Sequence, residues 1–158
     1  MRIALKVEYD GSQYHGWQAQ TNLRTVQFQL QEALSKVANH DIEVVCAGRT
    51  DTGVHATHQI IHFDSQSQRS LRAWVHGSNS FLANDVCVKH AYHVKDDFHA
   101  RYSATARRYR YVIYNSSIRP ALLRGQVSWQ YRHLEHSAMH QAAQCLIGEH
   151  DFTSFRSV

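Results

Sequence analysis

The stretch AGRTDTGVHA, residues 47–56, places a carboxylate among residue types that favour turns. Asp51 lies between Gly48 and Gly53, and Arg49 precedes it by two residues. Gly, Thr and Asp between two apolar runs predict a loop. A nearby arginine favours the ionised form of a carboxylate, and an ionised carboxylate can act as a nucleophile. The alternative is a turn aspartate for which Arg49 is a simple ion-pair partner.

A second group of candidates lies in ARYSATARRYRY, residues 100–111, which holds four arginines and three tyrosines. Arginine pairs with phosphates, and tyrosine offers a face on which a base can stack. Alternation along a strand divides the group between two faces, with Arg107, Tyr109 and Tyr111 on one and Arg108, Arg110 and Tyr114 on the other. A solvated basic face is the alternative, but one such face does not explain both sets.

The loop YDGSQYHGWQAQ, residues 9–20, is rich in aromatic residues for its length. Tyr14 and His15 stand beside Gly16, and we expect them to be hard to bury in a loop. Unstacked bases bind to such aromatic side chains, so the loop is a candidate contact for nucleic acid. Trp17 is either part of that contact or tucked into the core.

Histidine spacing raises the question of a metal site. Two clusters repeat the same spacing, and their members are His55, His58 and His62, then His133, His136 and His140. Neither cluster has the carboxylate or cysteine that completes a known signature such as HExxH. We therefore expect surface or hydrogen-bonded histidines and no metal.

Composition narrows the class of protein. The chain has 158 residues, 43% of them hydrophobic, with a formal net charge of +4. A packed core is feasible, and the basic charge favours a polyanionic partner. No run approaches the ~18 apolar residues of a membrane span, and the N-terminus lacks the apolar segment of a signal peptide. Three widely spaced cysteines form no disulfide framework. We expect a cytoplasmic protein with buried thiols and no membrane partner.

Periodicity predicts the elements that position these candidates. Strands are predicted at residues 2–10, 42–47, 58–64 and 85–94, and helices begin after the capping residues Thr25 and Ser70. The order strand, helix, strand, strand, helix, strand predicts an α+β, ferredoxin-like unit over residues 1–97. Its sheet is antiparallel, strands one and three are central, and helices cover one face. The loop of Asp51 then joins strands two and three at one end of the sheet.

Residues 98–158 predict the start of a second α+β unit. The pattern indicates strands at 107–115 and 127–131 and a helix at 136–148, which Gly148 ends. Three elements do not close a sheet with two helices, so this unit is expected to be incomplete.

Four segments together resemble one known family. YDGSQYHGWQAQ, AGRTDTGVHA, DDFHARYSATARRYRYVIYN and GEHDFTSFRS are similar, in this order, to segments of the tRNA pseudouridine synthase A family. The resemblance runs through the chain, which covers the N-terminal part of a typical member. It implies the pseudouridine synthase fold and conversion of uridine to pseudouridine at positions 38 to 40 of tRNA. It also implies a homodimer with tRNA across both subunits and no metal or organic cofactor.

The resemblance assigns roles residue by residue. Asp51 matches the catalytic aspartate, Arg49 the arginine that pairs with it and helps to extrude the target nucleotide, and Tyr109 the tyrosine that stacks on the uracil. The other matched positions are RNA contacts: Tyr14, His15, Trp17, Arg101, Arg107, Arg108 and Arg110. Because the family's C-terminal half supplies further residues of the cleft, we expect these 158 residues by themselves to be an inactive fragment.

Two other functions fit some of these observations. An RNA-binding module of the RRM type shares the split unit and the basic charge, but it needs an RNP-like aromatic pattern that strand 2–10 lacks. A metal-dependent hydrolase would use the histidines, and a measurement of bound metal would test it.

Overall fold

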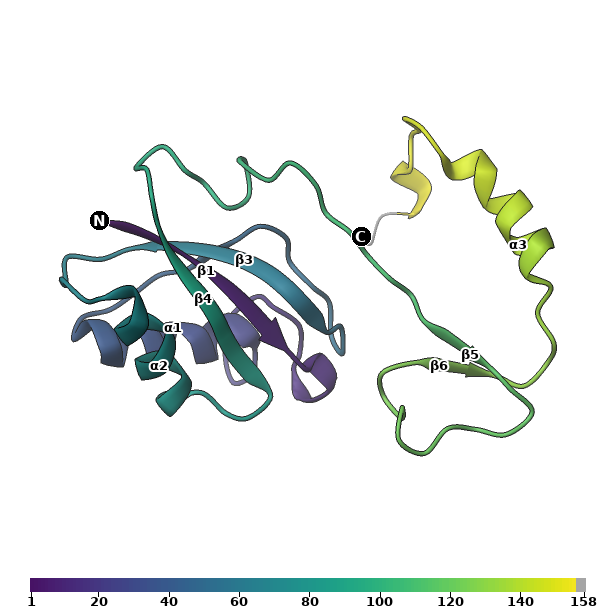
Figure 1. Ribbon diagram of the computed structural model, residues 1–158, viewed down its shortest axis with the longest axis horizontal. Helices are drawn as coiled ribbons and strands as arrows, with labels where there is room; N and C mark the ends of the chain where they lie inside the picture. Colours follow the sequence, from purple (N-terminus) through teal and green to yellow (C-terminus); the bar gives the residue numbers. More distant parts are fainter. Residues whose placement is uncertain (156–158) are drawn as a thin grey trace. The chain divides into compact units, whose positions relative to one another are not determined.

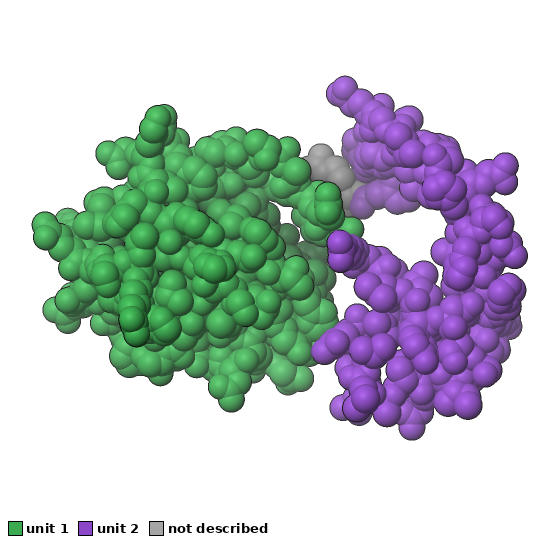
Figure 2. Space-filling view, in the orientation of Figure 1, with its two compact units in different colours: residues 1–109 green, residues 110–158 purple. Residues whose placement is uncertain are grey.

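The computed structural model describes residues 1–155, and the chain divides into two compact units, Met1–Tyr109 and Arg110–Val158 (Figure 2). We call them unit 1 and unit 2. The division lies after Tyr109 and not after residue 97, because residues 98–109 pack with the first unit. Residues 156–158 of the predicted second unit lie outside the described residues.

Unit 1 has the predicted order of elements (Figure 1). They are β1 (Arg2–Tyr9), α1 (Val26–Ala38), β2 (Val45–Cys46), β3 (Ala56–Asp64), α2 (Leu71–Phe81) and β4 (Val86–Val94), with a short 3-10 turn η1 (Gly11–Gln13) after β1. The sheet is antiparallel in the order β2-β3-β1-β4. The first and third strands are central, and both helices cover one face (Figure 1). The α+β, ferredoxin-like prediction is confirmed.

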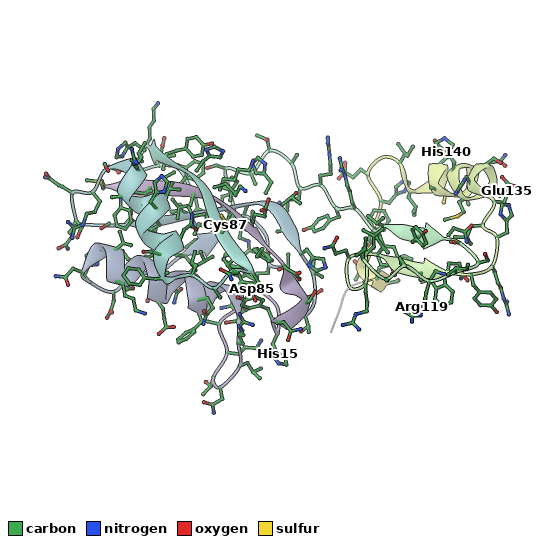
Figure 3. The ribbon with its side chains drawn as sticks, turned by 60° about the horizontal axis from the view of Figure 1, so that its bottom comes forward. His15, Asp85, Cys87, Arg119, Glu135 and His140 are labelled. Atoms are coloured by element: carbon green, nitrogen blue, oxygen red, sulfur yellow. The ribbon has the colours of Figure 1, made fainter. Side chains whose placement is uncertain are left out.

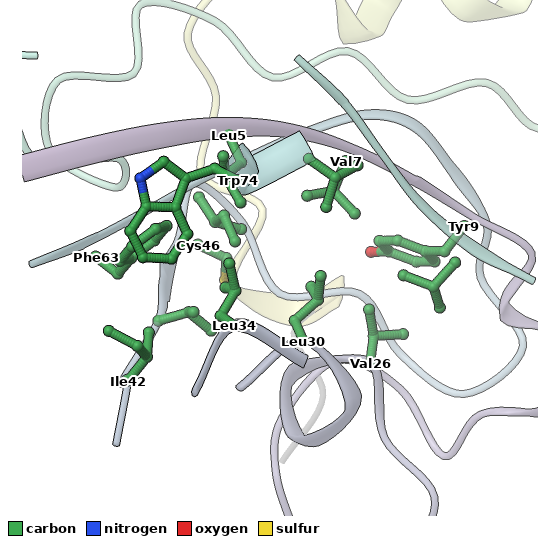
Figure 4. Close-up of a cluster of buried hydrophobic side chains, with 14 of the residues drawn as sticks. Leu5, Val7, Tyr9, Val26, Leu30, Leu34, Ile42, Cys46, Phe63 and Trp74 are labelled. Carbon is green, nitrogen blue, oxygen red and sulfur yellow. The ribbon is translucent and has the colours of Figure 1, made fainter. Parts of the chain in front are cut away.

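The core lies between that face and the helices (Figure 4). Side chains alternate along β1, so Leu5 and the residues two positions before and after it point to this side. Leu5 pairs there with Ile61 of β3. Trp74 of α2 packs edge-on against Phe63, with 5.0 Å between the ring centroids. This apolar contact fixes β3 beneath the helices, and β3 carries the downstream end of the loop that holds Asp51.

Two local predictions in unit 1 need correction. Thr25 precedes α1 as predicted, but its side chain makes no capping hydrogen bond. The amides of Val26 and Gln27 instead donate to the carbonyls of Gly16 and Trp17, so the aromatic loop caps the helix. Ser70 does cap α2, accepting from the amide of Ala73.

The strand predicted at 42–47 is limited to Val45 and Cys46. Upstream of it, the amides of Ile42 and Val44 donate to side chains of α1 and make no sheet bonds there.

Unit 2 contains two short strands, β5 (Ile113–Asn115) and β6 (Ser128–Gln130), which pair in parallel. They are followed by α3 (His136–Ala143), which Glu135 caps at its start and which has His140 in its last turn; Figure 3 labels both residues. Two 3-10 turns come next, η2 (Gln144–Leu146) and η3 (Thr153–Phe155). The strand predicted from residue 107 is wrong before Ile113, and the helix predicted to 148 ends early. Gly148 has the positive φ, 108°, expected of a stop.

No helix within residues 1–155 is long and apolar enough to cross a membrane.

Candidate active site

Asp51 stands exposed on the loop between β2 and β3, residues 47–55, which we call the Asp51 loop. The backbone on both sides of it is held in place. Thr50 receives a hydrogen bond from the Trp17 amide at 2.8 Å and shares another, 2.7 Å long, with the Tyr9 hydroxyl. On the other side, the Gly53 amide donates to the Tyr14 carbonyl at 3.3 Å. The loop therefore presents its carboxylate to solvent from a fixed backbone.

Glycine allows the aromatic loop, residues 9–20, to lie directly against the Asp51 loop. A Cβ on Gly11 would lie 2.1 Å from the carbonyl oxygen of Val54, and one on Gly16 would lie 2.8 Å from that of Thr50. Gly16 also has φ +83°, which side chains rarely adopt. Larger residues at either position would push the two loops apart.

The aromatic residues of this loop are largely buried, contrary to our expectation for Tyr14. The side chains of Tyr14 and Trp17 are only 2% and 1% exposed. Burial of Tyr14 is possible because its hydroxyl donates to Asp85 at 2.7 Å and its ring lies under Arg24. Burial, followed by the Asp85 carboxylate, raises the pKa of Tyr14 well above its usual value.

The position of these rings argues against direct stacking on RNA, and their contacts support a role in shaping the Asp51 loop. His15, labelled with Asp85 in Figure 3, is the exposed one of the three predicted contacts. RNA binding by this loop stays a prediction.

The base of the Asp51 loop is fixed by a residue that the sequence reasoning missed. The Gln59 amide donates to the Gly48 carbonyl at 2.5 Å, and the Ala47 amide donates to the Ile60 carbonyl at 2.8 Å. Gln59 is buried on the strand face that also carries Ile61 and faces the core. A glutamine in an apolar alternation was the available signal, because a buried amide needs a partner.

The chain after β4 passes the same loop. We call residues 95–109 the strap. Arg107 donates from Nε to the Ala47 carbonyl at 2.9 Å and from Nη2 to the Arg101 carbonyl at 2.8 Å. A Cβ on Gly48 would lie 3.4 Å from the Arg107 side chain and 3.6 Å from the Tyr109 hydroxyl. These are ordinary van der Waals distances, so the two strap residues pack directly against this part of the Asp51 loop.

These contacts border a cavity of about 530 Å³ that is open to solvent on one side. The residues that line it are Trp17, Gln18, Gln27, Val44, Val45, Cys46, Ala47, Gly48, Arg49, Arg101, Arg107 and Tyr109. Its volume lies within the range of roughly 300–1,000 Å³ that is usual for small-ligand sites. The structure therefore brings Arg49, Arg101, Arg107 and Tyr109 together. Asp51 is not among the lining residues and lies two positions beyond Arg49 on the same loop.

Other predicted residues are not gathered into this cavity. Arg108 is exposed, and Arg110 is the first residue of unit 2. No ion pair between Arg49 and Asp51 occurs within the described chain, so their predicted pairing stays a prediction. Cys46 of the lining is buried, and burial raises the pKa of its thiol.

The histidine clusters form no metal site in the described part of the chain. Over residues 1–155, no group of three or more His, Cys, Asp or Glu side chains is placed to hold a metal ion.

Two kinds of polar group line the cavity, and a third, the Asp51 carboxylate, stands near it. Guanidinium groups of Arg49, Arg101 and Arg107 suit phosphate oxygens, and the Tyr109 ring is 71% exposed and free to stack on a planar base. A carboxylate stands on the same loop. This combination fits a nucleotide that has been turned out of a polynucleotide chain.

Comparison with known proteins identifies relatives of this chain. The sequence profile of the family described as tRNA pseudouridine synthase matches residues 5–103. A tRNA pseudouridine synthase A of Legionella pneumophila strain Lens is 69% identical over 158 residues, which is 100% of this chain and 60% of the relative. One of Coxiella burnetii is 58% identical over 155 residues, 98% of this chain and 59% of the relative.

The chain thus spans about 60% of the length of the curated relatives that it matches. The family profile, residues 5–103, includes the whole Asp51 loop and the first part of the strap, but it ends before Arg107 and Tyr109. Those two residues lie within the 158 residues aligned with the Legionella pneumophila relative. The chain belongs to the tRNA pseudouridine synthase family.

Proposed function

We propose that the natural protein carrying these residues converts uridine to pseudouridine in tRNA, at positions 38 to 40 of the anticodon stem-loop. The observation that carries the proposal is an exposed carboxylate, fixed on a rigid loop, beside a cavity lined by arginines and a tyrosine. A base inside a stacked stem-loop is inaccessible, so the target nucleotide must leave the stack to reach the carboxylate. The cavity next to Asp51 is the place where it would be held.

The reaction fits the groups that the site provides. The bond between N1 and C1′ of uridine breaks, the uracil rotates, and C5 joins C1′; C5 loses its proton and N1 gains one. The product is an isomer of the substrate, so the chemistry consumes no oxidant, reductant or nucleotide cofactor. Asp51 either attacks C1′, adds to C6 or removes the C2′ proton, and all three steps use one carboxylate.

Four of the lining residues have roles in this proposal. Tyr109 stacks on the extruded uracil, and Arg49 pairs with Asp51 once the nucleotide is bound and helps to hold the nucleotide out of its stack. Arg101 binds phosphate. Arg107 already donates to two carbonyls, so it mainly holds the strap against the Asp51 loop. Arg108 and His15 are exposed for contacts with the RNA backbone.

The test uses the natural protein expressed from its gene and an unmodified tRNA transcript. Asp51→Asn should lower pseudouridine formation, mapped by mass spectrometry of tRNA fragments, at least about a thousandfold, because a covalent or proton-transfer group is lost. Its affinity for tRNA should stay within a few-fold. The matched control is Asp41→Asn, an exposed aspartate outside the cavity, which should keep full activity. Turnover by Asp51→Asn near the wild-type rate would overturn the proposal.

The resemblance also motivates two finer proposals. We propose that the natural protein is a homodimer that binds tRNA across both subunits, which sedimentation of the protein with and without tRNA would test. We propose a cytoplasmic location, which fractionation of cells that express the protein would test.

A further inference from the structure

The strap brings Arg101, Arg107 and Tyr109 to the cavity although it has no helix or strand of its own. It leaves β4 at the end of the sheet where β1 begins, since Arg2 pairs with Val94 (Figure 1). A segment without regular structure keeps its position only through specific contacts. The contacts that hold the strap on the sheet therefore decide where the three cavity residues stand.

One contact is made by His62, in the middle of β3. Side chains alternate between the two faces of a strand, and the neighbours of His62, Ile61 and Phe63, face the core. His62 therefore lies on the opposite face of the sheet, where it pairs with Ala4 of β1. It is nevertheless only 4% exposed, because the strap covers it. The Ala100 amide donates to its Nδ1 at 3.1 Å, and this bond is buried.

Aromatic contacts extend the same attachment. The His62 ring meets the Phe98 ring edge-on at 6.0 Å and the His99 ring at 4.8 Å, between centroids. His99 in turn stacks on Tyr102 at 4.3 Å. His62 is thus covered by three consecutive strap residues, and Arg101, which lines the cavity, follows them directly.

Arg2 holds the start of the strap. Its guanidinium donates to the carbonyls of Asp96 and Phe98, and it forms a two-pronged ion pair with Asp64 of β3. Arg2 and His62 together fix residues 96–100, and Arg107 fixes the far end against the Asp51 loop. His62 is the only one of these three anchors whose charge changes near neutral pH.

The hydrogen bond from Ala100 requires a lone pair on Nδ1, so His62 is neutral with its proton on Nε2. We propose that neutral His62 is a positioning residue for the reaction: by accepting this bond it holds the strap where Arg101, Arg107 and Tyr109 line the cavity. This inference rests on the proposed function, because it assigns a role within the same site.

The charged surroundings favour the neutral form. Burial lowers the pKa of His62, and the Arg2 guanidinium and His99 act in the same direction, while the Asp64 carboxylate opposes them. As pH falls below about 6.5, the unfolded chain takes up the proton before the folded chain does. The stability that neutral His62 contributes is therefore complete above that pH and is lost as the pH falls further. The strap contact itself is lost only at a still lower pH, where His62 of the folded protein takes up the proton.

Two variants of the 158-residue chain test the attachment itself. His62→Leu removes the acceptor and keeps an apolar side chain, whereas His62→Asn keeps an oxygen near the position of Nδ1. Exchange of the Ala100 amide, followed by NMR, should be about tenfold faster in His62→Leu, which reflects the loss of one hydrogen bond, and within about threefold of wild type in His62→Asn. His58→Leu, at an exposed histidine on the same strand, is the matched control and should leave this exchange unchanged.

The same variants in the natural protein test the role in the reaction. His62→Leu should lower kcat/KM for pseudouridine formation about tenfold, and His62→Asn should restore most of it. In wild type kcat/KM should fall on an acid limb, which should lie below the ordinary histidine value of about 6.5 because the pKa of His62 is lowered in the folded protein. This acid limb should disappear in His62→Asn because asparagine does not titrate. A purely structural role would not remove the limb.

Unchanged Ala100 exchange in His62→Leu, or an acid limb that persists in His62→Asn, would overturn the inference. Failure of the proposed function is distinguishable from either outcome. In that case Asp51→Asn keeps its activity, while the exchange measurement, which needs no reaction, still reports on the strap.

Discussion

Unit 1 and unit 2 differ most in what they bury. Every buried residue among those described lies at or before Ala100, so all of them belong to unit 1. Unit 2 exposes many large apolar side chains over residues 110–155; the most exposed are Tyr111, Ile118, Leu122, Ile147 and Phe155. Its two strands have three residues each. Isolated pairs of strands are marginal in water, so unit 2 gains little stability from its own contacts.

The difference explains where the site can be built. A cavity needs walls that keep their positions, and rigid walls need packed residues behind them. The Asp51 loop has such support from the buried Tyr9 and Trp17, and from Gln59 at its base. The apolar surface of unit 2 has the composition of a surface that other protein covers. On this basis we expect the 158-residue chain by itself to show weak, salt-sensitive tRNA binding and no isomerisation.

The largest expected effect compares two tryptophans. Trp74 is fully buried against Phe63, whereas Trp129 of unit 2 is 45% exposed. Trp74→Ala should lower the free energy of unfolding by about 3–5 kcal/mol, because it leaves a cavity in the core. Trp129→Ala should cost less than about 1 kcal/mol. Urea unfolding followed by far-ultraviolet circular dichroism measures both.

Trp74→Phe is the control for this pair. Its cost should be smaller than that of Trp74→Ala, because phenylalanine fills much of the space and the indole N–H of Trp74 has no hydrogen-bond partner among residues 1–155 to lose. Equal losses for Trp74→Ala and Trp129→Ala would mean that unit 2 has a core of its own.

The second effect concerns amide exchange in the two units. Amides of β1 lie between two partner strands, while β5 and β6 pair only with each other within the described chain. Hydrogen exchange followed by mass spectrometry should be at least about a hundredfold slower in β1 than in β5, because exchange in unit 2 needs only local opening. Limited proteolysis should first cut within unit 2. Similar protection of both strands would contradict the comparison.

The same difference explains what the sequence could predict. Alternation in β1 and the periodic stripe of α1 reflect burial, so unit 1 was predictable in order, topology and approximate bounds. RRYRYVIYN has equally good β propensity, yet only Ile113–Asn115 form a strand, because a strand needs a partner and β6 reaches no further.

Within the site, the family motifs predicted roles for Asp51, Arg49 and Tyr109, and these roles stay predictions. No pattern revealed which aromatic residues are buried. Tyr14 is buried through Asp85 and Arg24, which lie 71 and 10 residues away along the chain. The attachment of His62 to Ala100 spans 38 residues. Single-sequence patterns do not report contacts at such distances.

The third effect, on tRNA binding, compares an arginine at the end of unit 1 with one at the start of unit 2. The Arg107 side chain donates hydrogen bonds to two carbonyls of unit 1, whereas Arg110 is exposed in unit 2. In the natural protein, Arg107→Gln should weaken tRNA binding about tenfold, because the strap loosens as well as losing a charge. Arg110→Gln should chiefly flatten the dependence of log affinity on log salt, by roughly 0.7–0.9 if it neutralises one phosphate. Fluorescence anisotropy across a salt series measures both, and identical responses would remove the special role of Arg107.

The smallest effect compares the caps of two helices. Ser70 accepts from the Ala73 amide at the start of α2, which is packed on the core through Trp74. Glu135 accepts from the Ser137 amide at the start of α3, which has no buried residue. Ser70→Ala should lower the free energy of unfolding of the chain by about 1 kcal/mol, the usual cost of a lost cap. Glu135→Ala removes a comparable bond, but it should leave the main unfolding transition unchanged, because α3 has no buried residue. The variant should reduce only the helical circular-dichroism signal that comes from α3 and that is lost before the main transition. A shift of the main midpoint by Glu135→Ala as large as that by Ser70→Ala would show that the two units unfold together.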